Sequence, residues 1–366
     1  MLNSEIAAFP ADFSKLDLAS VKRVTLAVSG GGDSTALLRM FHHHWVAELR
    51  RAPGDLLAVT VDHQVRAESA EEARAVAAWC QKLGVQHSTV IWDGASQMSG
   101  FQNAAREARY DLISRAANEF GASTVLTGHT LDDQAETIAM RAQRSDPSQA
   151  VGLAGIAPAT LFQRNVWFVR PLLDQNRAKL RDWLEQNGHN WFDDPSNESL
   201  AYERVRARNT LAGSHPRAEV NSHDHAAARI ERAANAAIWL RALAVSLVES
   251  STGTIATVPA DFLKAEHASE GFTLLLMCIG QRAYWPDKVA AERCISEILR
   301  GNGRSFTVSG CMVRRSEDTV TIIPEQRNTQ PKGFGFDHLL PVWELAALDA
   351  LDELRGLAAV VRPPVR

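Results

Sequence analysis

A glycine-rich stretch near the N-terminus has the composition of an anion-binding loop. Residues 29–34, SGGGDS, follow an apolar β-branched run and precede an alanine- and leucine-rich segment. A strand that ends in such a loop and continues as a helix presents backbone N–H groups to an anion. Asp33 is useful beside phosphates if its carboxylate binds a bridging metal ion. The loop lacks the lysine of a Walker motif, and a tight turn without a ligand is the structural alternative.

A second polar stretch, residues 128–137, combines a histidine with several acids in the order GHTLDDQAET. His129, Asp133 and Glu136 fall at positions i, i+4 and i+7, so in a helix they share one face. Clustered carboxylates beside a histidine attract an ammonium group and can accept its proton. A structural role is the alternative, because Thr130 or Asp132 can cap the helix and acids suit its first turn.

Two smaller patterns accompany these stretches. Asp62 and His63 directly follow an apolar run, where the alternative is an ordinary polar end of a strand. Arg106 and Arg109 are three residues apart, so they lie on one side of a helix and offer forked donors to a phosphate. A solvated surface is the alternative for both arginines.

The elements that must position these residues alternate along the first half of the chain. Apolar runs predict strands over residues 24–28, 56–61, 87–92 and 124–127. The intervening segments predict helices over 34–50, 68–83 and 102–120, and a further helix from about Asp132. This alternation predicts an α/β fold with a parallel, doubly wound sheet. Ligands bind such sheets at the carboxyl ends of the strands, where residues 29–34, 62–66 and 128–136 all lie.

The second half of the chain has a different pattern. A helix is predicted over residues 177–187. From about residue 211 the sequence predicts mostly helices, at 226–250, 272–281 and 290–300, and then short strands at 306–308, 311–314 and 320–323. We therefore predict a catalytic domain over residues 1–215, a mostly helical domain with short C-terminal strands over 216–325, and a tail or partial domain over 326–366.

Composition narrows the class of protein. The 366 residues are 45% hydrophobic and carry a net charge of −4, so a nucleic acid would have to be bound by local basic clusters. The four cysteines are scattered without a C-x-x-C pair, which is typical of reduced thiols in the cytosol. The sequence shows neither a signal peptide nor a run long enough to span a bilayer. These features predict a cytoplasmic protein with no membrane partner, and they leave a homodimer open.

The loop pattern S-G-G-x-D-S resembles the PP-loop of the ATP pyrophosphatase superfamily. Further segments, taken in order, resemble the tRNA(Ile)-lysidine synthetase family: VDHQVRAES, NAAREARY, GHTLDDQAET, GLAGI, RPLL and DDPSNESLAYERVR. The match covers about residues 20–210. The resemblance implies that ATP, with Mg²⁺, is cleaved between its α and β phosphates and adenylates O2 of the wobble cytidine in the CAU anticodon of tRNA(Ile). The ε-amine of free L-lysine then displaces AMP at C2.

The resemblance also implies roles for individual residues. The phosphates and Mg²⁺ are bound by Ser29, Gly30, Gly31, Gly32, Asp33 and Ser34, with Asp33 as the metal ligand. Asp62 and His63 lie near the adenosine, while Arg109 and Arg106 contact phosphate or the target base. Lysine is positioned and deprotonated by His129, Asp133 and Glu136, and substrate is also bound by Asp132 and Thr137.

Two clusters of arginines are candidates for tRNA binding. Arg204, Arg206 and Arg208 lie in YERVRAR, where the family usually has Y-x-R-N-R-I-R. Valine and alanine replace the asparagine and isoleucine, so no role is carried over for that asparagine. The second cluster comprises Arg300, Arg304, Arg314 and Arg315. A solvated charged surface is the alternative for both clusters.

Two other functions stay open on the sequence. An RNA thiolase of the same superfamily would transfer sulfur, and such enzymes typically need paired cysteines or a cluster, which the cysteine spacing here disfavours. A non-catalytic nucleotide- or RNA-binding protein would not need Asp33 together with the set of His129, Asp133 and Glu136.

Overall fold

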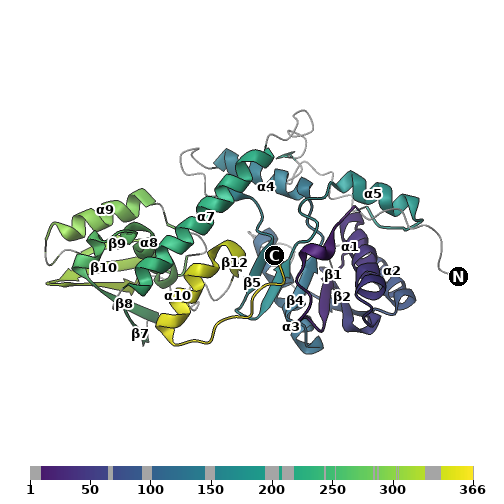
Figure 1. The fold of residues 1–366 in the computed structure, drawn as a ribbon, viewed down its shortest axis with the longest axis horizontal. Helices are drawn as coiled ribbons and strands as arrows, with labels where there is room; N and C mark the ends of the chain where they lie inside the picture. The colour runs from purple at the N-terminus through teal and green to yellow at the C-terminus, as the bar shows by residue number, and fades with distance from the viewer. Residues whose placement is uncertain are drawn as a thin grey trace. The chain divides into compact units, whose positions relative to one another are not determined.

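The computed structural model describes residues 10–64, 69–92, 101–144, 153–193, 206–207, 218–242, 245–251, 253–282, 285–286, 288–301, 303, 305–325 and 339–365. The chain forms two compact units (Figure 1). The first comprises Met1–His223 and Arg362–Arg366, and the second comprises Asp224–Val361. Among the described residues, no helix combines the length and the apolar character needed to cross a membrane.

The first unit alternates strands and helices, as the sequence predicts. Its strands are β1 Val24–Ala27, β2 Leu56–Asp62, β3 Gln86–Ile91, β4 Thr124–Thr127, β5 Ala159–Phe162 and β6 Val166–Val169. Its helices are α1 Gly32–His43, α2 Ser69–Leu83, α3 Phe101–Phe120, α4 Leu131–Arg144 and α5 Arg177–Gln186. Shorter turns are η1 Phe13–Lys15, η2 His44–Glu48 and η3 Pro53–Asp55.

The sheet of this unit is mostly parallel, which confirms the predicted fold class. Its strands run in the order β5-β6-β4-β1-β2-β3, and only β5 is antiparallel to its neighbour β6. The chain steps from β1 to β2 to β3 in one direction and then returns past β1 to β4. Because such crossovers are right-handed, α1 and α2 cover one face of the sheet and α3 covers the other. No strand was predicted from the sequence in the region of the hairpin of β5 and β6.

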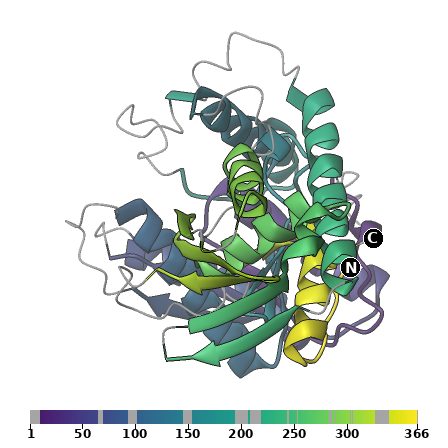
Figure 2. The ribbon, with the colours of Figure 1, turned by 90° about the vertical axis from the view of Figure 1, so that its left-hand side faces the viewer.

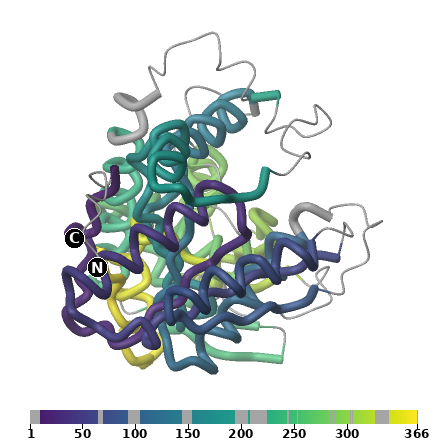
Figure 3. Tube along the Cα trace, turned by 90° about the vertical axis from the view of Figure 1, so that its right-hand side faces the viewer, coloured from purple at the N-terminus to yellow at the C-terminus, as the bar shows by residue number. Residues whose placement is uncertain are grey.

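Strands β1 and β4 are neighbours from which the chain leaves toward opposite sides of the sheet. This is the position at which doubly wound sheets bind ligands. The chain path from β1 through the glycine loop into α1 can be followed in Figure 3. The loop that follows β4 approaches the same place, since a Cβ on Gly128 would lie 3.0 Å from the carbonyl carbon and oxygen of Asp33.

The second unit contains an antiparallel sheet with helices on one face (Figure 2). The strands are β7 Ser246–Ser250, β8 Gly253–Pro259, β9 Ser305–Val308, β10 Cys311–Ser316 and β11 Thr319–Pro324, in the order β7-β8-β11-β10-β9. The helices are α7 Ala218–Arg241, which begins in the first unit, α8 Ala268–Ile279 and α9 Lys288–Leu299, with the turn η6 Ala260–Lys264. Alternate residues of β8, β10 and β11 are buried, so one face of the sheet packs on the helices.

One predicted helix of the second half is too long. Residues 226–250 were expected to form a single helix, but α7 ends at Arg241 and residues 246–250 form β7. The second unit is therefore richer in strands than the sequence predicts. The segment SLVES has no apolar alternation, and its side chains are mostly exposed, as suits a strand at the edge of a sheet.

The helix of the C-terminal segment packs with the second unit. Its elements are β12 Leu339–Pro341, the turn η8 Val342–Glu344 and helix α10 Leu345–Arg355. Helix α10 buries Ala347, Leu348 and Leu351, and Arg241 of α7 forms an ion pair with its Glu353 at 2.8 Å. Residues 339–361 are grouped with the second compact unit, while the predicted domains over 1–215, 216–325 and 326–366 stay predictions.

The close approach at Gly128 predicts a specific loss of stability. Gly128→Ala places a methyl group against main-chain atoms of Asp33 and Ser34, which cannot move as a flexible side chain would. We expect the free energy of unfolding to fall by about 1–3 kcal/mol, measured by denaturant titration. Gly54→Ala is the control, because a Cβ there meets nothing within 4 Å. Equal midpoints for the two variants would contradict this packing.

Candidate active site

The glycine loop after β1 is held by a segment far away in the sequence. The N–H of Phe192 donates to the carbonyl oxygen of Gly30 at 2.9 Å, and Gly31 and Phe192 form a parallel bridge. Gly30 has a φ of +88°, and a Cβ there would lie 3.0 Å from the ring of Phe192. Both the turn and the packing therefore require glycine. The ring of Trp79, from α2, stacks on the ring of Phe192, with centroids 5.5 Å apart.

Helix α1 opens directly onto this loop. Gly31 is its N-cap residue, and the first helical hydrogen bond runs from the N–H of Thr35 to the carbonyl oxygen of Gly31 at 2.9 Å. The N–H groups of Gly32, Asp33 and Ser34 precede that bond, so they point out of the end of the helix. This end of α1 has the geometry and the dipole that favour a bound anion.

The two serines of the loop face each other. Their hydroxyl oxygens are 3.1 Å apart, and the N–H of Ser29 donates to Oγ of Ser34 at 3.2 Å. The hydroxyl of Ser34 also donates to the carbonyl oxygen of Gly31 at 3.0 Å. Both serines thus help to shape the loop, in addition to the role in phosphate binding that we propose below.

The start of α4 uses an acid as a cap. Asp133 Oδ2 accepts hydrogen bonds from the N–H of Thr130 at 2.7 Å and from its hydroxyl at 3.0 Å. This arrangement satisfies donors that the helix end leaves unpaired. One oxygen of Asp133, Oδ2, therefore has a structural role at the start of the helix. The other oxygen, Oδ1, contacts Arg177.

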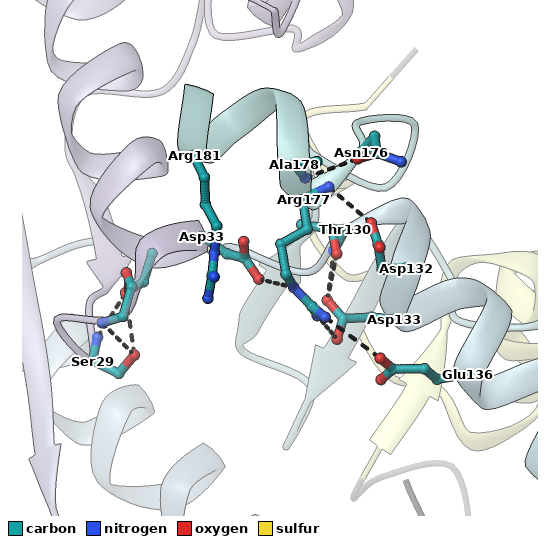
Figure 4. A network of polar contacts seen from close by, with 12 residues as sticks. Ser29, Asp33, Thr130, Asp132, Asp133, Glu136, Asn176, Arg177, Ala178 and Arg181 are labelled. Atoms are coloured by element: carbon teal, nitrogen blue, oxygen red, sulfur yellow. Dashed lines mark hydrogen bonds and ion pairs between the residues drawn. The ribbon is translucent and has the colours of Figure 1, made fainter. Parts of the chain in front are cut away.

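Arg177 connects three carboxylates from two different helices (Figure 4). Its Nε lies 2.9 Å from Asp33 Oδ2, one terminal nitrogen lies 3.1 Å from Asp133 Oδ1, and the other lies 3.5 Å from Glu136 Oε1. Asp33 belongs to the first turn of α1, whereas Asp133 and Glu136 belong to α4. The guanidinium group therefore joins the glycine loop to the acidic face of α4.

The backbone of Arg177 is fixed as well. Its N–H donates to Asp132 Oδ2 at 2.8 Å, and Asn176 caps the same helix by accepting the N–H of Ala178 at 2.8 Å. Helix α5 also packs against α1. Asp132, which we expected to bind substrate, therefore has a structural contact that positions Arg177.

Burial and charge oppose each other in this cluster. Burial raises the pKa of Asp33, and the nearby Arg177 offsets only part of the rise. Burial alone would lower the pKa of Arg177, but the negative charges of Asp33 and Asp133 outweigh it and the pKa is raised. Glu136 is only 2% exposed. Arg177 thus remains charged and compensates acids that would otherwise repel each other.

One oxygen of this cluster fits a hard cation. Among the described residues, Oδ1 of Asp33 is buried and has no hydrogen-bond partner, whereas Oδ2 of the same side chain binds Arg177. A carboxylate oxygen at the edge of an anion-binding helix end is a suitable ligand for Mg²⁺. The residues present therefore fit the metal that the sequence implies.

His63, directly after β2, lies beside Arg109 in the middle of α3. A guanidinium nitrogen of Arg109 is 3.2 Å from His63 Nε2, and Trp92 packs edge-on against the imidazole with centroids 5.5 Å apart. Burial lowers the pKa of His63, and the charge of Arg109 lowers it further. A neutral imidazole can accept the N–H of Arg109. Asp62 instead shapes its own loop, where its Oδ1 accepts the N–H of Gln64 and the hydroxyl of Ser69, both at 2.8 Å.

Arg106 has a different neighbour from Arg109. It lies over the ring of Tyr110 and donates to the Tyr110 hydroxyl at 3.3 Å. The same hydroxyl accepts a hydrogen bond from the buried Arg170 at 3.0 Å. Arg106 and Arg109 thus have different neighbours, and their role toward a common ligand stays a prediction.

His129 corrects a second expectation. Helix α4 begins at Leu131, so His129 precedes the helix and does not share its face with Asp133 and Glu136. Its Nδ1 lies 2.9 Å from the hydroxyl of Thr127 at the end of β4. The i, i+4, i+7 spacing does not apply to His129, because His129 lies before the helix, which was predicted from about Asp132 and begins at Leu131.

The remaining predicted residues are more scattered. Thr137 is half-buried on α4, and Arg206 is exposed, while Arg204 and Arg208 lie outside the described residues. In the second basic cluster, Arg300 pairs with Glu297 and Arg315 donates to carbonyl oxygens at the end of α9. Arg314 is exposed, and Arg304 lies outside the described residues.

Sequence reasoning missed Arg177, although it located the start of its helix. A positively charged residue at the first helical position is unfavourable for the helix dipole. An arginine directly after the capping Asn176 was therefore a signal that a compensating negative charge lay nearby.

Comparison with known proteins agrees with this geometry. A family model described as a PP-loop domain matches residues 3–214. A tRNA(Ile)-lysidine synthase of Mesorhizobium japonicum is 36% identical over 375 residues, which cover 99% of this chain and 79% of that protein. One of Brucella ovis is 38% identical over 315 residues, or 83% and 68% of the two chains. The solved U34-tRNA thiolase NcsA of Methanococcus maripaludis has 17% identity and a TM-score of 0.44, covering 56% of this chain and 71% of that one.

The sheet, the glycine loop and the family model together define a PP-loop domain, and so an enzyme class that uses ATP. Within that class, the identity over most of both chains shows that this chain belongs to the tRNA(Ile)-lysidine synthase family. It is an ATP-using ligase.

The contact between His63 and Arg109 predicts a depressed histidine pKa. We expect the imidazole of His63 to titrate below 6.5 in an NMR pH titration, since burial and Arg109 both disfavour its charged form. Arg109→Gln should raise this pKa only part of the way, because burial remains. The stabilisation that neutral His63 provides is complete above pH 6.5 and is lost as the pH falls through its folded pKa.

His87 is the internal control in the same spectra. Burial alone lowers its pKa, so Arg109→Gln should leave its titration unchanged. A His63 pKa at or above 6.5 would contradict the contact.

Proposed function

We propose that this chain joins lysine to C2 of the wobble cytidine in the CAU anticodon of tRNA(Ile), forming lysidine. In the first step, O2 of the cytidine attacks the α phosphorus of ATP and pyrophosphate leaves. In the second, the ε-amine of lysine attacks C2 and AMP leaves. The observation that carries the proposal is the set of ion pairs that joins Asp33 to Asp133 and Glu136. It brings carboxylates suited to an amine next to N–H groups suited to phosphate.

The first step needs a site that stabilises the departing pyrophosphate. The N–H groups of Gly32, Asp33 and Ser34 at the start of α1 are oriented for this task before the reaction begins. Such preorganised donors stabilise charge that develops on a leaving group. Phe192 holds the loop in this conformation, so little reorganisation accompanies the step.

Asp33 is the residue that would hold Mg²⁺, through the buried oxygen that does not contact Arg177. When bound, the metal supplies positive charge to the phosphate oxygens. The other oxygen of Asp33 stays with Arg177 at 2.9 Å, so one side chain can serve both the metal and the acidic cluster.

The second step needs a neutral amine, although free lysine carries an ammonium group with a pKa of about 10.4. Asp133 and Glu136 are 8% and 2% exposed, and they lie on the same side of α4. Buried carboxylates of this kind bind an ammonium group and can accept its proton as the amine attacks. We assign the proton to Glu136, because one oxygen of Asp133 already caps the helix. His129 lies outside this pair and would contact the substrate from the end of β4.

The adenosine would lie beside the end of β2 and the middle of α3. His63 and Arg109 are paired there, with Trp92 next to the imidazole. Arg109 can donate to a phosphate or to the target base while His63 orients it. Arg106, on the same helix, is exposed and would act with it.

The tRNA would meet the arginines of residues 204–208. Arg206 is exposed, as a contact to phosphate requires, and the neighbouring arginines continue the same stretch of sequence. Binding through phosphate contacts should weaken steeply as salt rises. A chain with these substrates would work in the cytoplasm.

Sulfur transfer is a less suitable chemistry for this chain. A thiolase that carries sulfur on cysteine needs a reactive thiolate. All four cysteines here are buried and none forms a disulfide, and burial raises the pKa of Cys80 and Cys311 to about 12. The thiols of Cys80 and Cys311 therefore stay protonated at neutral pH.

The proposal is tested by incubating the protein with ATP, Mg²⁺, labelled lysine and a CAU-anticodon transcript of tRNA(Ile). We expect lysine to enter the tRNA with one AMP and one pyrophosphate released for each lysine. A transcript with a GAU anticodon is the control, since it lacks the wobble cytidine. ATP-dependent modification that requires sulfide instead of lysine would overturn the proposal in favour of a thiolase, and no turnover would favour a binding protein.

Two variants separate the two steps. Asp33→Ala should abolish adenylation, because it removes the metal ligand from the phosphate site. Glu136→Gln should leave adenylation of the tRNA within about threefold and slow lysine attachment by about 10²–10⁴-fold, the usual contribution of a general base. Single-turnover assays with labelled ATP and with labelled lysine measure the two steps. Glu119→Gln, at an exposed position of α3, is the control and should change neither. Equal loss of both steps in Glu136→Gln would contradict its role.

A further inference from the structure

The guanidinium group of Arg177 occupies the same carboxylates that we propose for lysine. It lies 3.1 Å from Asp133 Oδ1 and 3.5 Å from Glu136 Oε1 (Figure 4). The second oxygen of Asp133 is already bonded to Thr130. An incoming ammonium group would therefore have to share or take over the oxygens that Arg177 now uses.

Sharing is unfavourable for two reasons. A second cation within a few ångströms of the guanidinium is repelled, and the repulsion is stronger in a buried site than in water. The arginine side chain is only 18% exposed, and Glu136 is almost fully buried. In the arrangement seen here, the site for the amine is thus closed by a residue of the protein itself.

The contacts of Arg177 allow its side chain to move while its backbone stays in place. The N–H of Arg177 is bonded to Asp132, and Asn176 caps the helix, so the Cα position is fixed by α4 and by the start of α5. Within the described part of the chain, the flexible arm beyond Cα is held by ion pairs to the three carboxylates. Those ion pairs can be exchanged for another anion of suitable geometry.

ATP would supply that anion. Asp33, which is 2.9 Å from Nε of Arg177, lies in the first turn of α1, beside the N–H groups proposed for the phosphates. A guanidinium group binds phosphate in a forked, bidentate manner that suits its planar geometry. The distance that the guanidinium must travel is therefore within the reach of one side chain.

We propose that Arg177 is a positioning residue that makes lysine binding depend on ATP. In one state its guanidinium neutralises Asp133 and Glu136 and closes the amine site. When ATP binds, the guanidinium transfers to the phosphates, and the two carboxylates become available to the ammonium group of lysine. The inference rests on the proposed function. It orders the substrates, because the amine enters only once the nucleotide that will activate the cytidine is in place.

The experiment measures the affinity of the full-length protein for L-lysine by calorimetry, with and without saturating α,β-methylene-ATP in magnesium buffer. In the unmodified protein we expect the analogue to tighten lysine binding by at least tenfold. By linkage, saturating lysine should tighten binding of the analogue by the same factor. This pair of measurements needs no variant, so it does not depend on whether an altered protein folds.

The variant Arg177→Gln tests the residue itself. Without the nucleotide analogue it should bind lysine at least tenfold more tightly than the unmodified protein, because the closing cation is gone. Lys179→Gln is the matched control: it removes one positive charge from an exposed position of the same helix and should leave lysine affinity unchanged. Circular dichroism checks that both variants are folded.

The outcomes separate this inference from the proposed function. Equal lysine affinity with and without the analogue would overturn the role of Arg177 while leaving lysine as a substrate. The same conclusion follows if Arg177→Gln binds lysine no more tightly than the unmodified protein in the absence of the analogue. Lysine binding in no condition, with the analogue bound, would overturn the proposed function and this inference together.

Discussion

The ion pairs of Arg177 are the interaction on which the rest of the site depends. Three carboxylates from α1 and α4 converge in a space that is largely closed to water, and such an arrangement is stable only with a compensating cation. Loss of one partner from a buried charge pair typically costs about 3–5 kcal/mol. The single guanidinium therefore does more than bind three acids. In the arrangement seen here it holds the glycine loop close to the acidic end of α4, the two parts that we propose to serve successive chemical steps.

The sheet supplies the second constraint. Because β1 and β4 are adjacent, the loops that follow them must share one small region at the carboxyl edge. Gly128 lets the backbone after β4 approach the first turn of α1 to a distance that a side chain would prevent. Two residues therefore shape the site. Gly128 has no side chain and lets two backbone segments meet, and Arg177 has a long charged side chain that binds three acids.

Much of the first unit could be predicted from the sequence, because its strands are short apolar runs separated by helices of ordinary length. The three polar stretches at strand ends were located for the same reason. The hairpin of β5 and β6 was missed because periodicity in so short a segment gives a weak signal. His129 was placed on the face of α4 from its spacing to Asp133. It lies two residues before the helix begins, so it does not share that face.

Arg177 illustrates a different limit. Its partners are 41 to 144 positions away in the chain, so no local pattern could reveal them. What the sequence did contain was a local inconsistency, a cation at the positive end of a helix. Such inconsistencies are expected where a tertiary contact overrides local preference, and they often mark functional residues.

Phe192 joins two events that are separate in the proposed reaction. Its backbone is bonded to Gly30 and bridged to Gly31, and the arginine-rich stretch that would bind RNA begins about a dozen residues further along the same chain. The backbone contacts of Phe192 thus place the glycine loop next, along the sequence, to the segment that we propose for RNA binding. Substitutions at Phe192 would therefore bear on the proposed nucleotide site and on the start of the proposed RNA-binding segment alike.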